Sequence, residues 1–209
     1  MTRNNLDDLI TQGENTRLEF KRSISSANRI ARTLAAFANT SGGTLLIGVA
    51  DNGKIVGVPS EFREVHKIED ATDQFVEPAL TVSYETLTPD GRIVLVVHVA
   101  ESTEKPHYAV DESGQRTIYV RAKDKSVPTN KLIITKEKAD VHELVKSPMT
   151  RTLIQYLRKN EYVTPERFAK LINISDYRAG KMLRLLAVQG LLLMIDKPRP
   201  VRYALKLAE

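Results

Sequence analysis

Residues 34–51, with the sequence LAAFANTSGGTLLIGVAD, decide the fold of the N-terminal part of this chain. Apolar side chains at helical spacing predict a helix that runs to about Asn39, and Gly42-Gly43 then ends it, because glycine adopts the left-handed conformation of a helix C-terminus. The apolar run at 44–50 predicts a buried strand, and Asp51-Asn52-Gly53 predicts a tight turn. A helix that leads directly into a buried strand indicates packing of a helix on a sheet.

The sequence on either side of this segment adds further strands. Residues 16–21 alternate between apolar and polar side chains, which is typical of a strand, and Ser25 or Ser26 can cap the helix that follows. The other predicted elements are a strand at 54–58, a helix at 59–77, a hairpin formed by 79–87 and 92–100, and a strand at 117–122. Because the strands outnumber the helices and are mostly joined by hairpins, we expect an α+β fold and not a doubly wound sheet.

The charge is distributed unevenly along the chain. Its 209 residues include 31 Lys and Arg against 26 Asp and Glu, a formal net charge of +5. Residues 147–209 hold 12 basic and 5 acidic side chains, a net charge of +7, which leaves residues 1–146 at −2. This asymmetry predicts domains with different partners. We expect an α+β domain at residues 1–133, a linker at 134–148 and a second domain at 149–209.

Composition excludes several kinds of site. The chain has no cysteine, so disulfides, thiolate nucleophiles, iron–sulfur clusters and zinc–thiolate sites are impossible. The most apolar runs, at 93–100 and 190–195, are shorter than the roughly 20 residues of a membrane-spanning helix. The first ten residues lack the apolar core of a signal peptide. We therefore expect a soluble cytoplasmic protein without a membrane partner.

The C-terminal region has the order of elements found in a winged helix-turn-helix domain. Thr164-Pro165 and Ser175 are start signals for its second and third helices, and Gly190 ends the third. The predicted elements are helices at 149–160, 165–172 and 176–189, followed by strands at 191–195 and 201–205. Three helices and a hairpin in about sixty residues predict such a domain, with the third helix placed to enter a DNA major groove.

Basic side chains on the third helix and the predicted wing are suited to nucleic acid. Arg178 and Lys181 can contact guanine edges or phosphates, and positive charge near the wing suits the backbone. The candidate nucleic-acid-binding residues are Ser175, Tyr177, Arg178, Lys181, Arg184, Lys197, Arg199 and Arg202. We expect double-stranded DNA as the partner, because a helix fits the B-form major groove and not the narrow A-form groove. The alternative is a winged helix used for protein contact or dimerisation.

One segment nearly matches a phosphate-binding loop. Residues 48–55, GVADNGKI, follow the pattern G-x-x-x-x-G-K-[ST] except at Ile55, which stands where a Mg²⁺-binding hydroxyl is required. Such a loop also opens a helix, whereas a β-rich segment follows here. We therefore do not expect ATP hydrolysis at this loop.

Several polar residues outside these motifs have two interpretations. The backbone amides around Asn39, Thr40 and Gly42-Gly43 can bind a phosphate, or they only end a helix and start a strand; the structural interpretation is favoured. Basic side chains near the first helix and the last strand become phosphate contacts only if the fold gathers them into one groove. These side chains are Arg29, Arg32, Arg121 and Lys123.

Taken together in their order along the chain, six short segments resemble the AlbA-like domain of the Schlafen superfamily, which is common in bacterial DNA-binding proteins and transcriptional regulators. The matching segments are ENTRLEFK at 14–21, LAAFANTSGG at 34–43, LIGVAD at 46–51, IVG at 55–57, KPH at 105–107 and YVR at 119–121. Each segment alone is weak, but the ordered set over about residues 10–130 is specific. The resemblance implies an AlbA-like α+β domain.

The resemblance also implies a second kind of chemistry. Nuclease members of the superfamily are similar to metal-dependent ribonucleases with three acids, and the matching positions are Glu14, Glu19 and Asp51. A hard cation such as Mg²⁺ or Mn²⁺ prefers carboxylate oxygens and can position a water, while Lys21 can hold the phosphate. Glu14 and Glu19 differ in parity along a strand, so they converge only if the chain bends near Gly13.

The alternative for these residues is structural. Glu19 and Lys21 can form an ordinary salt bridge, and Asp51 favours a turn without any catalytic role. Fold resemblance does not carry function with it.

The leading interpretation is a nucleic-acid-binding protein, a DNA-binding transcriptional regulator that uses its C-terminal winged helix. The alternative is a Mg²⁺- or Mn²⁺-dependent endonuclease with metal ligands Glu14, Glu19 and Asp51. Without that activity the chain is not expected to be an enzyme or to need a cofactor. A third interpretation is a regulator that senses a nucleotide or another ligand. A homo-oligomer is expected only from the general frequency of two-fold dimers.

Overall fold

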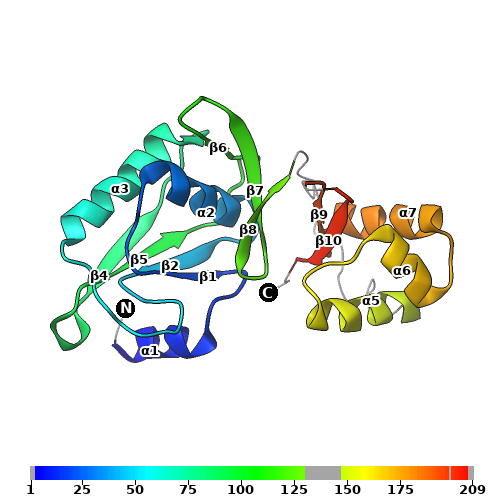
Figure 1. The fold of residues 1–209 in the computed structure, drawn as a ribbon, viewed down its shortest axis with the longest axis horizontal. Helices are drawn as coiled ribbons and strands as arrows, with labels where there is room; N and C mark the ends of the chain where they lie inside the picture. The colour runs from blue at the N-terminus through cyan, green and yellow to red at the C-terminus, as the bar shows by residue number, and fades with distance from the viewer. Residues whose placement is uncertain (1–2, 130–146, 198, 207–209) are drawn as a thin grey trace. The chain divides into compact units, whose positions relative to one another are not determined.

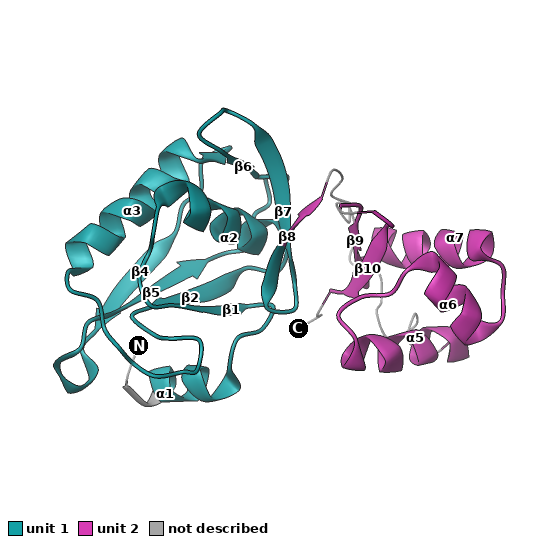
Figure 2. Cartoon of the chain, viewed as in Figure 1, with its two compact units in different colours: residues 1–126 teal, residues 127–209 magenta. Residues whose placement is uncertain are grey.

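The computed structural model describes residues 3–129, 147–197 and 199–206. The chain forms two compact units, residues 1–126 and 127–209 (Figure 2). The division falls a few residues before the predicted domain end at residue 133. The predicted linker at 134–148 lies outside the described residues except for its last two positions.

The N-terminal unit is built on a four-stranded mixed sheet. Its strands follow the order β1-β2-β5-β4, with β1 parallel to β2 and the other pairs antiparallel (Figure 1). Their bounds are Leu18–Lys21 for β1, Gly43–Ile47 for β2, Ser83–Leu87 for β4 and Val94–Val99 for β5. The parallel pair arises because the crossover between β1 and β2 contains a helix, as parallel strands require.

A second sheet has the order β3-β6-β7-β8, and all of it except residues 127–129 of β8 belongs to the same unit. Its strands are β3 at Val76–Glu77, β6 at Tyr108–Val110, β7 at Arg116–Ala122 and β8 at Lys125–Thr129. Only β7 was predicted as a separate strand, because β3, β6 and β8 are short and have no clear alternation of apolar side chains.

Helices cover both faces of the first sheet (Figure 1). On one face, α2 (Ala27–Asn39) and α3 (Glu61–Gln74) form the larger core with the side chains of Leu45, Leu95 and Val97. On the other face, α1 (Arg3–Gln12) inserts Leu6 against Leu46 and Val96. The single turn η1 (Pro89–Gly91) joins β4 to β5. The fold is therefore α+β, as predicted.

One sequence expectation for this unit was wrong, and one helix was not predicted. Residues 54–58 do not form a full return strand: isolated bridges join Val49 to Ile55 and Val58 to Ile93. The chain turns at Gly57, which has a φ of +74°, so regular pairing cannot continue. The sequence reading also placed no helix at α1, because only three apolar side chains mark its buried face.

The C-terminal unit contains three helices and a two-stranded antiparallel sheet. Its elements are α5 (Pro148–Lys159), α6 (Pro165–Ile172), α7 (Asp176–Val188), β9 (Leu192–Ile195) and β10 (Arg202–Leu205). Thr164 and Ser175 accept hydrogen bonds from the backbone N–H groups of Arg167 and Arg178, as N-caps do. Phe168, Leu183 and Tyr203 lie in one core. The predicted order of elements is confirmed. No helix in the described part of the chain is long and apolar enough to cross a membrane.

Candidate carboxylate site and candidate nucleic-acid interface

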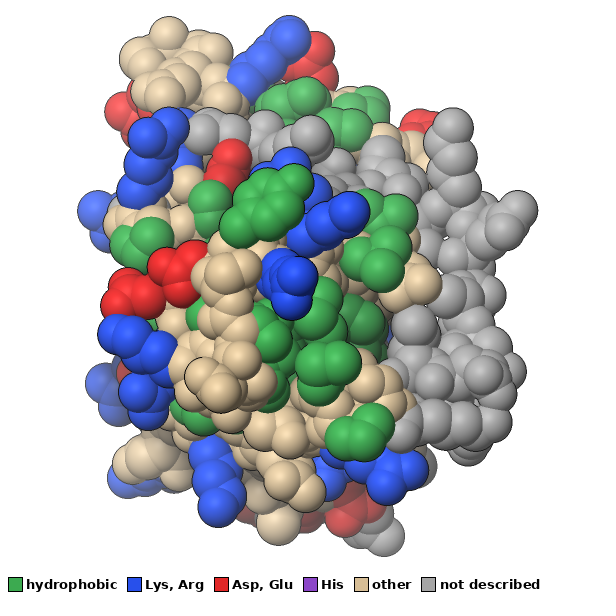
Figure 3. Space-filling view, turned by 90° about the vertical axis from the view of Figure 1, so that its right-hand side faces the viewer, with side chains coloured by type: hydrophobic (Ala, Val, Ile, Leu, Met, Phe, Trp, Pro, Cys, Tyr) green, Lys and Arg blue, Asp and Glu red, His purple; other side chains and the backbone are tan. Residues whose placement is uncertain are grey.

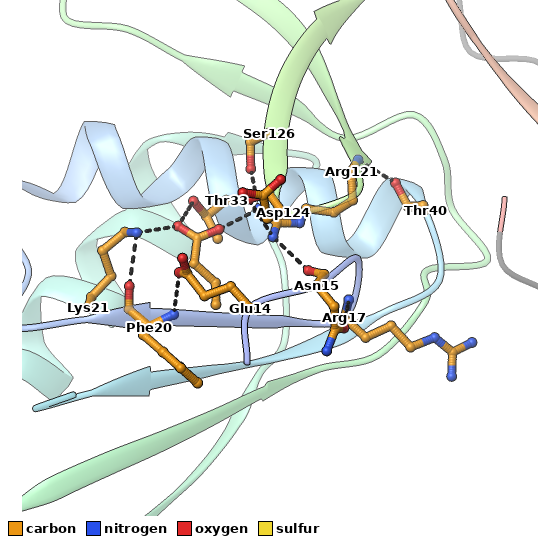
Figure 4. Close-up of polar contacts among 11 residues, drawn as sticks. Glu14, Asn15, Arg17, Phe20, Lys21, Thr33, Thr40, Arg121, Asp124 and Ser126 are labelled. Carbon is orange, nitrogen blue, oxygen red and sulfur yellow. Dashed lines mark hydrogen bonds and ion pairs between the residues drawn. The ribbon is translucent and has the colours of Figure 1, made fainter. Parts of the chain in front are cut away.

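A fully buried arginine organises the first candidate site. The Arg121 side chain is 0% exposed, and its guanidinium forms an ion pair with Glu19, which is itself buried. The same group donates to the Ser126 hydroxyl and to the carbonyl oxygens of Asn15 and Asp124, each at 3.0 Å (Figure 4). The sequence suggested Arg121 as a candidate phosphate contact. The structure contradicts this role, because the buried guanidinium is already bonded to partners inside the protein.

The Glu19 carboxylate is surrounded by donors. Besides Arg121, the Lys21 ammonium lies 2.6 Å from Glu19 Oε1, and the Thr33 hydroxyl donates to the same oxygen at 3.3 Å. The ion pair of Glu19 with Lys21 is the structural alternative stated above. Burial lowers the pKa of Arg121, and the adjacent Glu19 raises it again in part. Each of the two carboxylate oxygens of Glu19 is therefore paired with a cationic side chain.

Glu14 approaches this cluster because the chain bends where the parity argument required it. Gly13 has a φ of +69°, and residues 15–18 close a tight turn through paired backbone hydrogen bonds between Asn15 and Leu18. The Glu14 carboxylate then accepts a hydrogen bond from the Phe20 N–H at 2.9 Å. Figure 4 shows Glu14 on the same side of β1 as Lys21 and Thr33. The predicted bend is confirmed.

Asp51 does not join these two acids in a metal-binding arrangement. It is exposed in the turn between Ala50 and Lys54, and no group of three His, Cys, Asp or Glu side chains among the described residues is placed to hold a metal ion. A Mg²⁺ or Mn²⁺ ion needs several free oxygen ligands, and those of Glu19 are engaged. The donor set as folded does not fit a divalent cation.

A small cavity adjoins the cluster at the start of α2. Its volume is about 160 Å³, and Lys21 and Arg29 are its basic lining residues. Ser23, Ser25, Ser26 and Thr33 complete its polar lining. The cavity has the chemistry of an anion site, and Arg29, unlike Arg121, is exposed.

The near match to a phosphate-binding loop folds as a turn. The N–H groups of Gly48 and Val49 both donate to the Lys21 carbonyl oxygen, and the N–H of Gly53 donates to the Ala50 carbonyl oxygen. The next helix, α3, begins only at Glu61. A phosphate cradle needs free amides at a helix N-terminus, and these amides are already bonded.

In the segment that ends α2, backbone amides are likewise bonded within the protein. The N–H groups of Thr40 and Gly42 both donate to the Phe37 carbonyl oxygen. The Asn39 side chain donates to the carbonyl oxygens of His107 and Tyr119 and accepts from the His107 N–H. Asn39 and His107 therefore join α2 to the second sheet, and the favoured structural interpretation agrees with these bonds.

The second candidate site is the exposed face of α7. Tyr177 is 81% exposed, and Arg178 and Lys181 are exposed on the same helix, while Ala179 and Leu183 face the core. Neither Arg178 nor Lys181 has a side-chain partner within the described part of the chain. Ser175 is exposed but caps the helix, so its hydroxyl is engaged with backbone. In Figure 3, Lys and Arg side chains lie around and among hydrophobic ones on this side of the molecule.

The other predicted contact residues differ in how far they are engaged within the protein. Arg184 is exposed, yet it lies near the Tyr203 hydroxyl, whose pKa is raised by burial and partly lowered again by Arg184. Arg202 is half-buried and stacks over the Tyr162 ring at 4.7 Å. Lys197 and Arg199, in the connection between β9 and β10, are exposed. Sequence reasoning missed the pairing of Arg202 with Tyr162, because the two residues are distant in sequence.

These features define an α+β domain followed by a small basic unit of three helices and a hairpin. The family model described as "Schlafen, AlbA_2" matches residues 14–130, more than half of the chain. The chain belongs to this family. The match confirms the resemblance for the N-terminal domain and does not extend to the helices α5–α7.

Individual relatives are more distant. The chain is 28% identical over 124 residues to "Uncharacterized ATP-binding protein UU034" of Ureaplasma parvum, an alignment that covers 50% of this chain and 35% of that protein. Among solved structures, the DIP2311 protein of Corynebacterium diphtheriae gives a TM-score of 0.44 at 20% identity and covers 60% of this chain and 29% of that one. The chain thus spans about a third of these two relatives.

A third relative is a single domain. The N-terminal domain of a RecG-related protein of Nitrosomonas europaea gives a TM-score of 0.45 at 26% identity, with 65% of this chain and 96% of that domain covered.

Proposed function

We propose that this protein is a DNA-binding transcriptional regulator whose C-terminal unit is a winged helix-turn-helix domain. The observation that carries the proposal is the exposed face of α7. There Arg178 and Lys181 project from a capped helix and have no side-chain partner among the residues that the structure describes. Membership in the Schlafen AlbA_2 family supports nucleic acid as the class of partner.

The charge of the C-terminal region supports the same conclusion. Residues 147–209 carry 12 basic and 5 acidic side chains. Such an excess attracts the phosphate backbone and supplies most of the affinity for non-specific DNA. A helix pair at α6 and α7 followed by a hairpin is the arrangement in which the second helix of the pair enters the major groove.

The candidate residues divide by their expected role. Arg178 and Lys181 lie in the first half of α7, where base contacts of a recognition helix are made. Lys197 and Arg199 are exposed in the β9–β10 connection and would contact phosphates. Arg184 and Arg202, which interact with Tyr203 and Tyr162, are expected to contribute less.

Fluorescence anisotropy with labelled duplex DNA tests the proposal in the full-length chain. Arg178→Ala and Lys181→Ala are each expected to weaken binding by about 1–3 kcal/mol if they contact bases, and the affinity is expected to fall steeply with salt. Arg158→Ala on α5 is the matched control, because it removes one exposed charge from the same unit. Equal losses in all three variants, or binding that salt does not change, would overturn the proposal.

Single-stranded DNA and structured RNA in the same assay separate the partner classes. Tighter binding of duplex DNA is expected, since a helix fits the B-form major groove. Preference for RNA would overturn the assignment of the partner.

The nuclease alternative retains one supporting observation: Glu14, Glu19 and Lys21 lie together beside a basic cavity. Its test is Mn²⁺- or Mg²⁺-dependent cleavage of a panel of RNAs and DNAs. Glu14→Gln is the cleaner variant, because removal of Glu19 would leave buried Arg121 without its partner. Cleavage that is lost in Glu14→Gln would favour the alternative; no cleavage of any substrate would exclude it.

The name of the Ureaplasma relative raises ATP as a ligand. Because the N–H groups of Gly48, Val49, Ala50 and Gly53 are bonded to backbone carbonyl oxygens, we do not place ATP at that loop. In a thermal-shift experiment with ATP and Mg²⁺, Lys54→Ala is expected to respond as the unaltered chain does, because Lys54 holds no phosphate at this loop.

A further inference from the structure

A polar row crosses the face of the first sheet that α1 covers only in part. Under α1 this face is apolar: Phe20, Leu46 and Val96 pack against Leu6. Two residues away on the neighbouring strands, the same face carries Thr44 opposite His98. Ser83 lies opposite His98 from the other side. The change from apolar to polar side chains marks the part of the face that faces water.

His98 is held at both ring nitrogens. Its Nδ1 lies 3.1 Å from the Thr44 hydroxyl, and its Nε2 lies 3.4 Å from Glu85 Oε1. A carboxylate at one nitrogen orients an imidazole and favours the tautomer that leaves the other nitrogen facing the hydroxyl. The ring and the hydroxyl are therefore positioned in advance, which lowers the entropy lost when a ligand binds.

This row forms one wall of an open cavity with a volume of about 520 Å³. That volume lies within the range of small-molecule sites and far exceeds the space needed by an inorganic ion. The polar lining residues are Arg17, Ser41, Thr44, Thr81, Ser83, His98 and Glu101.

The chemistry of the lining favours an oxyanion attached to a hydroxylated body. Arg17 precedes β1, and its guanidinium points away from the Arg121 cluster (Figure 4). Guanidinium groups bind phosphate with two parallel hydrogen bonds. The acid of the lining, Glu101, is paired with Lys105, which reduces its repulsion of an anion.

We propose that this cavity is a binding site for a small phosphate ester with free hydroxyl groups, such as a sugar phosphate or a mononucleotide. Arg17 binds the phosphate, and the hydroxyls of Thr44 and Ser83 bind the hydroxylated part. His98, whose two ring nitrogens are engaged, holds the Thr44 hydroxyl in position. The site lies wholly in the N-terminal unit and does not depend on the proposed binding of DNA by α7.

Proton–nitrogen NMR spectra of the full-length chain test the proposal with ribose 5-phosphate, AMP, adenosine and inorganic phosphate as probes. Ribose 5-phosphate or AMP at millimolar concentration is expected to shift the amide signals of Gly42, Gly43 and Ala100, which border the cavity. Adenosine, which lacks the phosphate, is expected to bind at least about tenfold more weakly, as the loss of a charge-assisted hydrogen bond implies. A response to inorganic phosphate alone, with none to the esters, would overturn the assigned ligand class.

Variants locate the site. Arg17→Ala and His98→Ala are each expected to weaken ester binding about tenfold. Arg29→Ala, which removes a cation from the smaller cavity at α2, is the matched control and is expected to change nothing. Signals that move at Ser25 and Ser26 instead, or esters that bind Arg17→Ala as well as the unaltered chain, would overturn the proposal. The absence of any shift would do the same and would leave the DNA-binding experiments unaffected.

Discussion

The two units differ in whether their charged side chains are buried or exposed. Among the described residues, the buried charged side chains of the N-terminal unit include Glu19, Glu64 and Arg121, whereas the buried polar residues of the C-terminal unit are Thr129 and Thr150. On α7 the cations Arg178 and Lys181 are exposed instead. A charge that is buried must be neutralised within the protein. In the second unit, α7 therefore presents two exposed basic side chains, Arg178 and Lys181, to a partner.

The comparison also separates two kinds of basic residue that look alike in sequence. Arg121 stacks over the Phe37 ring at 4.7 Å and binds two carbonyl oxygens, so its loss should affect folding. The Arg178 side chain is exposed and has no charged partner among the described residues, so its loss should affect binding. The following predictions test this division, from the largest expected effect to the smallest.

Arg121→Ala is expected to destabilise the N-terminal unit by about 3–5 kcal/mol, because Glu19 would remain buried without its main partner. Urea unfolding followed by circular dichroism measures the change. Arg116→Ala on the same strand is the control, since the ion pair of Arg116 with Glu77 is exposed and should contribute little. A loss for Arg121→Ala no larger than that of the control would refute the structural role.

Gly43→Ala is expected to cost about 1–3 kcal/mol through overpacking. A Cβ at this position would overlap the Phe37 ring and lie 2.9 Å from the Arg17 carbonyl oxygen. Thermal unfolding measures the effect, and Ser41→Ala, which adds no atom, serves as the control. An unchanged melting temperature would show that β2 can move away from α2.

Ser175→Ala is expected to destabilise the C-terminal unit by about 1 kcal/mol, because the hydroxyl accepts the Arg178 N–H at the start of α7. Ser26→Ala provides the comparison in the other unit, since the Ser26 side chain makes no capping hydrogen bond to α2. Urea titrations of both variants should show the larger loss for Ser175. The reverse order would contradict the assigned caps.

Gly180→Ala is expected to stabilise α7 by roughly 0.5–1 kcal/mol, because glycine weakens a helix interior relative to alanine. A Cβ there would meet the Pro165 ring at 3.7 Å, which is ordinary contact. A small rise in the melting temperature is expected, with DNA affinity unchanged. A fall would mean that α6 and α7 pack more closely than described.

Local signals explain how well the C-terminal unit was predicted. Thr164-Pro165 and Ser175 marked helix starts, and the structure begins α6 and α7 at the next residue in each case. Capping depends on hydrogen bonds within one turn, so it can be read from neighbouring residues. The exposure of Arg178 and Lys181 followed from the same helical spacing.

The carboxylate site was only partly predictable. The ordered motifs brought attention to Glu14 and Glu19. Parity showed that these two acids converge only if the chain bends near Gly13, and the structure has that bend. The sequence did not predict that Arg121 is the partner of Glu19, because the two residues are 102 positions apart. The separation of Asp51 from both acids also depended on how the strands pair.

The sequence alone determined the α+β class, the family resemblance, the division of charge between the two regions and the helices of the C-terminal unit. Each of these depends on composition or on neighbours within a few residues. The tertiary structure decided which charges are buried, that Arg121 binds Glu19, and that Thr44, His98 and Ser83 form one polar row. Those outcomes depend on strand register and on contacts between distant segments, which no local pattern encodes.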